Sequence, residues 1–149
     1  MKKITIPKEE AVFWLDKNGR WHNQHGPFEH KKVIDYFHSV IRKDAEGYYL
    51  FQATEEVEEK VYFPHEDTAL FVFDVRFEQD VTLTLNTGRR LPLIPEALFI
   101  REDNLYLKID DETARFSADA LVRLSPLLEE DGDRIMIKMQ DRLFPIPQG

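Results

Sequence analysis

The clearest hydrophobic pattern in the chain lies at its centre, in residues 69–77. Apolar side chains occupy every second position there and share one face, while Asp74 and Arg76 point to the other face. Residues 81–85 alternate in the same way, and only the short polar segment 78–80 separates the two runs. This pattern predicts an antiparallel hairpin in the middle of the chain.

Two segments, 30–43 and 117–129, instead carry apolar residues at helical spacing, so we expect one helix in each. Ser117 is well placed to cap the second helix, and Pro126 falls inside that helix, where it predicts a kink. The segment 89–95 is rich in proline and is expected to be irregular. Shorter alternating runs predict further strands over 11–15, 48–53, 57–63, 98–101, 105–109, 134–139 and 143–146.

The two helical segments belong to a longer internal similarity. Adding 87 to the residue numbers places the apolar face of the first helix on that of the second, and the turn 44–47 on the turn 131–134. We therefore predict an α+β fold of two similar hairpin–helix–hairpin units, 1–64 and 65–149, with mostly antiparallel sheets. The central antiparallel hairpin, 69–85, would join them. A single match of this kind can also arise by chance in an α+β protein.

Composition restricts the classes of function that fit. The chain has 149 residues, 42% of them hydrophobic, a formal net charge of −8 and no cysteine. The absence of cysteine excludes disulfides, thiolate zinc sites and cysteine nucleophiles. An acidic surface repels phosphate backbones and anionic lipids, so neither a nucleic acid nor a membrane is an expected partner. No run approaches the roughly 20 apolar residues of a membrane span, and the first ten residues do not resemble a signal peptide, so we expect a cytoplasmic protein.

The stretch WHNQHGPFEH, residues 21–30, holds the densest candidate chemistry. One interpretation is a strand end, a Gly-Pro turn and a helix start. The other is one wall of a ligand site, with Trp21 as an aromatic floor and His22 and His25 as polar partners, because pockets combine aromatic rings with a few polar groups. The histidine spacing fits no familiar zinc pattern, so we expect no metal and no cofactor.

Other charged residues offer weaker candidates. Asp67, Arg89 and Arg90 could contribute polar or anion-binding groups to a ligand site, although each also fits an ordinary charged turn. His38 falls on the side of its helix that faces away from the apolar residues, so we expect it to be exposed. The glutamate-rich segment 55–59 is expected to belong to a hydrated edge strand.

Several short motifs are spread along the chain: Gly19-x-Trp21, Pro27-Phe28, Asp44-x-x-Gly47, Glu66-Asp67 before the phenylalanine-rich strand, and Asn86-x-Gly88. Together they resemble an uncharacterised bacterial family known as domain of unknown function 1285. The similarity extends over roughly residues 12–110, and the C-terminal third departs from the family pattern. The resemblance implies a tandem α+β arrangement with repeated motifs and a ligand-binding or signalling role, and it implies no catalytic residue.

Three functions remain open from the sequence. The first is a module that binds a small molecule or a protein, with a regulatory or signal-transduction role. Its predicted site residues are Trp21, His22, His25, Asp67, Arg89 and Arg90. The second, less favoured, is a hydrolase that uses His22 or His25 with Glu29, with or without a metal. The third is a structural subunit that presents an aromatic sheet face to a partner.

Overall fold

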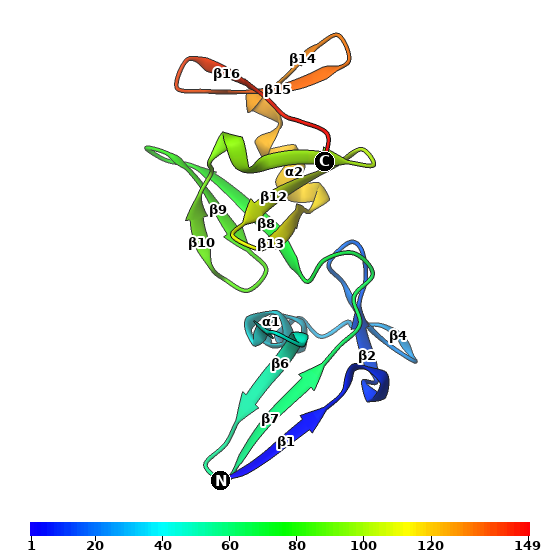
Figure 1. Cartoon of the computed structure of the whole chain (residues 1–149). Coiled ribbons are helices and arrows are strands. Elements are labelled where there is room, and N and C mark those ends of the chain that lie inside the picture. The colour runs from blue at the N-terminus through cyan, green and yellow to red at the C-terminus, as the bar shows by residue number, and fades with distance from the viewer. The chain divides into compact units, whose positions relative to one another are not determined.

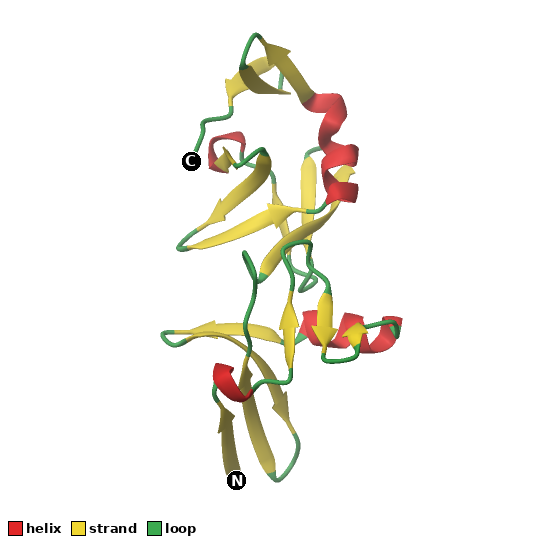
Figure 2. Ribbon diagram, turned by 90° about the vertical axis from the view of Figure 1, so that its right-hand side faces the viewer, coloured by secondary structure: helices red, strands yellow, loops and turns green.

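The chain forms two compact units, Met1–Ala69 and Leu70–Gly149. The structure is a computed structural model that describes all residues from Met1 to Gly149. Each unit contains mostly antiparallel sheets and one α-helix, so the predicted α+β class is confirmed (Figures 1 and 2). The sequence had suggested 1–64 and 65–149 as the two units. No helix of the structure has the length and apolarity that crossing a bilayer requires.

Two sheets and one helix make up the first unit. Its elements are β1 (Lys2–Ile6), the 3-10 turn η1 (Lys8–Glu10), β2 (Phe13–Leu15), β3 (Trp21–Asn23), β4 (Gly26–Pro27), α1 (Lys31–Ser39), β5 (Ile41–Asp44), β6 (Gly47–Ala53) and β7 (Val57–Tyr62). The larger sheet has the order β1-β7-β6-β5, and β2, β3 and β4 form a small antiparallel sheet. In the larger sheet only the β1–β7 pair is parallel.

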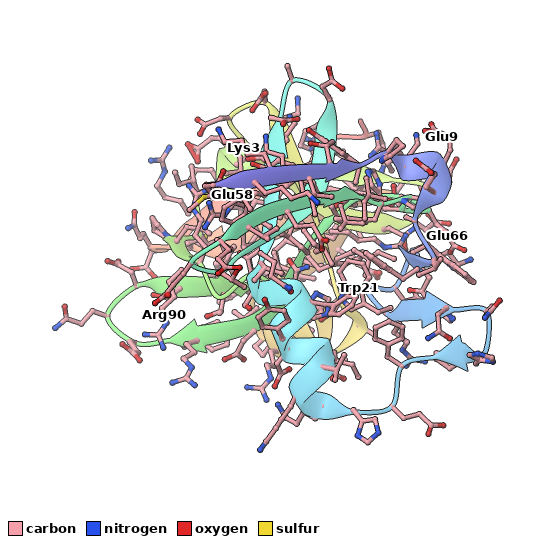
Figure 3. The ribbon with its side chains drawn as sticks, turned by 90° about the horizontal axis from the view of Figure 1, so that it is seen from below. Lys3, Glu9, Trp21, Glu58, Glu66 and Arg90 are labelled. Carbon is pink, nitrogen blue, oxygen red and sulfur yellow. The ribbon has the colours of Figure 1, made fainter.

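The glutamate-rich strand β7 is central, so its predicted edge position is wrong. β1 pairs with one side of β7 and β6 with the other. The N-terminal strand supplies one basic residue opposite a glutamate: Lys3 pairs with Glu58 in the register, and their charged atoms lie 3.9 Å apart (Figure 3). The acidic run is thus neutralised in part by a distant segment of the chain, which its local pattern could not reveal.

Both predicted helices end earlier than expected, and a strand follows each. α1 stops at Ser39, and β5 then pairs with β6, so that Ile41 lies opposite Leu50. β-branched residues such as Ile41 pack well on a pleated sheet, which explains why the helical spacing of the apolar residues was misleading here. Gly47 closes the β5–β6 turn with a φ of 127°, a value that other residues rarely adopt.

The second unit combines a six-stranded sheet with a three-stranded one. Its elements are β8 (Leu70–Phe77), β9 (Val81–Leu85), β10 (Arg90–Pro92), η2 (Pro95–Ala97), β11 (Leu98–Arg101), β12 (Asn104–Ile109), β13 (Glu112–Phe116), α2 (Ala118–Leu124), η3 (Ser125–Leu127), β14 (Leu128–Asp131), β15 (Arg134–Met139) and β16 (Arg142–Pro145). The larger sheet has the order β10-β9-β8-β13-β12-β11, and the smaller has the order β14-β15-β16. α2 packs against β8 and β13.

The central hairpin β8–β9 forms as predicted, but its surroundings differ from the prediction. The segment expected to be irregular contains β10, which pairs with β9. β13 was not predicted and runs parallel to β8. A register shift in the β8–β9 pairing, between Val72 and Asp74, interrupts the alternation in β8. The three residues before Phe73 are all buried, because the strand is covered on both faces there; they are Leu70, Phe71 and Val72.

The start of α2 confirms the predicted cap. The Ser117 hydroxyl oxygen accepts a hydrogen bond from the backbone N–H of Ala120 at 3.2 Å. The α-helix ends at Leu124, and Pro126 lies in the 3-10 turn η3 rather than in a kinked α-helix. Proline tolerates this position because an N–H in the first turn of a helix needs no internal partner.

The predicted internal repeat agrees with one local feature. Ile41 pairs with Leu50, and the residues 87 positions later, Leu128 and Ile137, pair in the same register. The environments of the two helices differ, since α2 packs against the six-stranded sheet whereas α1 contacts an aromatic cluster near β2 and β3. The interpretation as a repeat therefore stays a prediction.

Candidate functional site

Trp21 is a core residue of the first unit. Its side chain is 1% exposed, and its ring lies 4.9 Å from that of Phe63, 5.3 Å from that of Phe37 and 5.8 Å from that of Phe13. Close aromatic packing of this kind stabilises a domain but leaves no room beside the indole. The predicted aromatic floor is therefore the anchor that holds α1 against β2 and β3.

His38 is buried, so its predicted exposure is wrong. Its side chain is 3% exposed, and its Nδ1 atom accepts a hydrogen bond from the indole N–H of Trp21 at 3.3 Å. Burial lowers the pKa of His38 to about 4, although the nearby Asp35 carboxylate acts in the opposite direction. The imidazole is therefore neutral at pH 7. Because an indole nitrogen can only donate, the proton of this imidazole belongs on Nε2.

His22 forms an acid–imidazole pair with Asp16 and not with Glu29. The His22 Nε2 and Asp16 Oδ2 atoms are 2.7 Å apart. Burial by itself raises the pKa of Asp16, but hydrogen bonds from Arg20, His22 and Asn18 outweigh it and lower the pKa overall. Two of these bonds come from backbone N–H groups and hold the carboxylate in the β2–β3 turn. Asp16 Oδ1 accepts from the backbone N–H of Asn18 at 2.8 Å and from that of Arg20 at 2.9 Å.

Trp14 covers one face of the His22 ring. The ring stacks on Trp14 with centroids 5.6 Å apart and an interplanar angle of 8°. No group of three or more histidine, aspartate or glutamate side chains in the structure is arranged to hold a metal ion. The geometry around His22 thus offers an oriented imidazole, but it does not reproduce the His–Glu pair that the hydrolase alternative needs.

A groove opens on the far side of the aromatic cluster, between the β3–β4 turn and the start of α1. Its volume is about 410 Å³, within the usual range of ligand pockets. We refer to it as the histidine groove. Its apolar lining residues are Pro27, Phe28, Val33 and Phe37, and its polar lining residues are Asn23, His25, Glu29 and His30.

Local interactions shape the histidine groove. The Asn23 side chain accepts a hydrogen bond from the backbone N–H of His25 at 2.8 Å, and Gly26 adopts a φ of 113° that lets the chain reverse. The backbone N–H of Phe28 then bonds to the carbonyl of Trp21 at 2.9 Å. These bonds fix the segment 23–28 beside α1 and leave the imidazole of His25 exposed.

Two aromatic rings form the floor of the histidine groove. Phe28 and Phe37 meet edge to face with centroids 5.1 Å apart. Phe37 in turn contacts Phe13 and Trp21, so the floor is continuous with the core. Val33 borders the groove on α1 and is 43% exposed, so its side chain is accessible from the groove.

The structure does not bring every predicted site residue to this groove. Of the six, only His25 lines it. The backbone carbonyl of Asp67 lies 3.3 Å from His65 Nδ1, in the segment after β7. Arg89 and Arg90 are exposed residues of the second unit at the start of β10. Within the stretch 21–30 that the sequence singled out, His25 lines the groove, whereas Trp21 is buried in the core and His22 is paired with Asp16.

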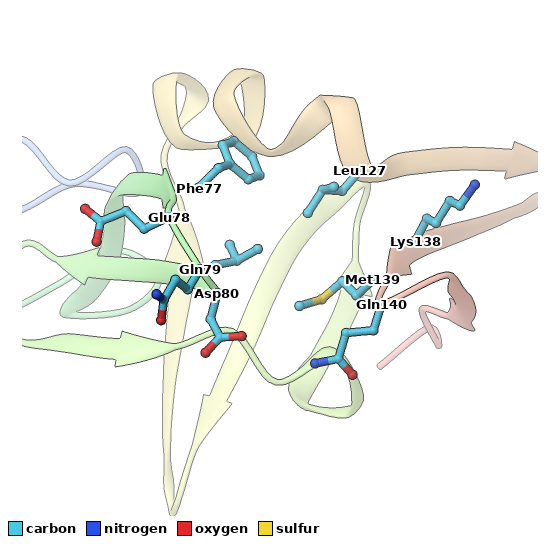
Figure 4. A pocket seen from close by; sticks show the side chains of 9 residues that line it. Phe77, Glu78, Gln79, Asp80, Leu127, Lys138, Met139 and Gln140 are labelled. Atoms are coloured by element: carbon cyan, nitrogen blue, oxygen red, sulfur yellow. The ribbon is translucent and has the colours of Figure 1, made fainter.

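Two further hollows in the structure are less suited to a ligand. One, of about 300 Å³, lies beside Tyr48, Tyr62 and His65 in the first unit, and its rim carries charges of both signs, from Lys8 and Glu9. The other, in the second unit, measures about 180 Å³ and lies between the β8–β9 turn, Leu127 and the end of β15 (Figure 4). The second hollow is smaller than typical ligand pockets.

A polar cluster in the larger sheet of the first unit could not be predicted from the sequence. Asp44 accepts hydrogen bonds from the Tyr62 hydroxyl at 2.6 Å and from Lys60 at 3.0 Å. The Tyr62 bond, assisted by Lys60, lowers the pKa of Asp44 to about 2. All three groups are engaged with one another, so the cluster ties β5 to β7 and offers no free acid or base.

The fold of this chain is similar to that of two solved structures. No protein-family model and no curated protein sequence matches the chain. Two solved structures do. A DUF1285 family protein from Silicibacter pomeroyi DSS-3 superimposes with a TM-score of 0.64 at 17% identity, covering 95% of this chain and 81% of that one. A DUF1285 family protein from Shewanella baltica OS155 gives a TM-score of 0.56 at 16% identity, covering 80% of this chain and 94% of that one.

This chain has the DUF1285 fold. The resemblance to domain of unknown function 1285 that the sequence motifs suggested is confirmed at the level of structure. The DUF1285 likeness also extends beyond the motif-bearing region, since the match to the Silicibacter protein covers most of the chain. At such low identity the likeness establishes the fold alone, and any function must be argued from the residues of this chain.

Proposed function

We propose that this protein is a ligand-binding module and that the histidine groove is its binding site. The observation that supports the proposal is a groove of about 410 Å³ in which an aromatic floor adjoins outward-facing imidazole, carboxylate and amide groups. Small-molecule sites combine these features, with apolar surface for affinity and a few polar groups for orientation.

The lining of the groove defines the kind of ligand. Phe28 and Phe37 suit an apolar group of about the size of a ring, because aromatic pairs gain from edge-to-face contact. His25 and His30 can each donate or accept a hydrogen bond, since a neutral imidazole has one nitrogen of each kind. The ligand is therefore a small amphipathic molecule, or the side chain of a partner protein with the same chemistry. A regulatory or signal-transduction role would follow if its binding changed a partner's affinity for the protein.

A fragment screen tests the proposal. Small aromatic compounds with one polar group are added to the full chain, and binding is mapped by amide chemical shifts. We expect hits to shift the amides of residues 23–37. The variant Val33→Lys places a long charged side chain at the groove and should weaken these hits at least about tenfold, the effect of losing roughly 1.4 kcal/mol of binding free energy.

The same substitution elsewhere in the unit provides the control. Val12 is 80% exposed and does not line the groove, so Val12→Lys should leave the hits unchanged. The groove is not the binding site if the hits shift amides outside residues 23–37. The same conclusion follows if the hits bind the Val33→Lys and Val12→Lys variants equally well.

A further inference from the structure

The second unit contains a cavity of about 360 Å³ that is open to solvent on one side and whose lining is unlike that of the histidine groove. We refer to it as the aliphatic cavity. Its apolar walls contain leucine and isoleucine and no aromatic ring. They are Ile100 of β11, Leu105 of β12, Leu121 of α2, Leu128 of β14, Ile135 of β15 and Ile146 after β16.

The last residues of the chain hold one wall in place. The backbone N–H of Ile100 donates to the carbonyl of Pro147 at 2.8 Å, and the N–H of Gly149 donates to the carbonyl of Ile100 at 2.7 Å. The final segment therefore pairs with the outer edge of β11. This pairing keeps the buried Ile146 at the cavity and covers an edge that would otherwise be open.

The charged residues at the cavity are all acidic. Asp103 lies in the β11–β12 turn and Asp133 in the β14–β15 turn, and both are exposed residues that line the cavity. Asn104, the remaining polar residue on β12, is already bonded to Arg115 at 2.9 Å. No lysine, arginine or histidine lines the cavity. A cation is therefore favoured at the mouth and an anion is disfavoured.

We propose that the aliphatic cavity binds an aliphatic ammonium compound. Its hydrocarbon part lies among the leucine and isoleucine side chains, where removing apolar surface from water is favourable. Its ammonium group lies at the carboxylates of Asp103 and Asp133. This inference is independent of the proposed function, because the two sites share no residue and belong to different units.

Three probes with the same six-carbon chain separate the two contributions. Hexylammonium, 1-hexanol and hexanoate are titrated into the full chain, and the amide shifts of residues 100–105, 121 and 135 are followed. We expect hexylammonium to bind about tenfold more tightly than hexanoate, with hexanol between them, because two exposed carboxylates contribute modestly. Added salt should reduce this preference, since it screens exposed charges.

Charge-removing variants test the role of the carboxylates. The double variant Asp103→Asn with Asp133→Asn should bind hexylammonium and hexanoate about equally. The matched control is Asp110→Asn with Asp141→Asn, which removes the same charge from two residues that do not line the cavity and should keep the preference. Asp103, Asp110 and Asp141 all have a φ between 55° and 63°, a region that asparagine also tolerates.

A cavity-filling pair tests the location. Leu121→Phe should abolish binding of all three probes, whereas Val122→Phe, at the adjacent position, which is 70% exposed, should not. Equal binding of hexylammonium and hexanoate to the natural protein would overturn the proposal, as would the absence of shifts at the cavity residues. Should Leu121→Phe fail to fold, the two asparagine double variants decide the question alone.

Discussion

The buried imidazole of His38 makes the stability of the first unit depend on pH in a defined way. The pKa of His38 is about 4 in the folded protein, whereas the ordinary value of 6.5 applies to the unfolded chain. The unfolded chain therefore binds more protons between these values, and the folded state loses stability as the pH falls from about 6.5 toward 4. Below pH 4 both states are protonated and the loss stops growing.

The size of the effect follows from the two pKa values. The linkage relation gives a loss of about 2 kcal/mol between pH 7.5 and pH 5, and about 3 kcal/mol at pH 4. The variant His38→Asn removes the titrating ring but keeps an oxygen that can accept the Trp21 N–H. We expect it to be less stable than the natural protein at pH 7.5, since it leaves a small cavity, yet to lose about 2 kcal/mol less on acidification to pH 5.

Urea unfolding followed by tryptophan fluorescence is the appropriate assay. The only two tryptophans, Trp14 and Trp21, both lie in the first unit, so the signal reports on that unit. Burial also lowers the pKa of His65, but His65 is present in both proteins and cancels in the comparison. Parallel stability curves for the two proteins between pH 7.5 and 5 would refute the reasoning, as would a His38 imidazole that titrates near pH 6.5 by NMR.

Two further predictions concern single hydrogen-bonding groups. Ser117→Ala removes the cap of α2 and should lower the free energy of unfolding of the second unit by about 1 kcal/mol. Native-state hydrogen exchange of the amides in this unit measures the change, and an effect confined to the first unit would contradict the prediction. Asp16→Asn removes the charged partner of His22 and should destabilise the first unit by about 1 kcal/mol at pH 7. Folding lowers the pKa of Asp16, so the stability that this carboxylate contributes is present above its ordinary pKa of 3.8 and is lost as the pH falls below that value. The difference in stability between Asp16→Asn and the natural protein should therefore shrink in acid, and a difference that grew would refute this assignment.

The elements that the sequence predicted correctly depend on interactions between near neighbours. The β8–β9 hairpin, the strand β15 and the Ser117 cap each involve residues that are close along the chain, so period-2 alternation and capping chemistry were sufficient. Helix ends were less predictable. The apolar residues after Ser39 and after Leu124 continue the helical spacing, but they pair as strands with segments that lie further along the chain.

For this protein, the α+β class, the central β8–β9 hairpin, the Ser117 cap and the lack of any cysteine chemistry could be inferred from the sequence, which also singled out the stretch 21–30. Only the tertiary structure showed that β1 pairs in parallel with β7 and β13 in parallel with β8. It alone also showed that Trp21 and His38 are buried together, and that the walls of the aliphatic cavity come from segments between Ile100 and Gln148. The physical reason is that a hydrophobic period shows which face of an element is buried but not which partner covers it. Parallel pairing and cavities depend on contacts between segments that are distant in sequence.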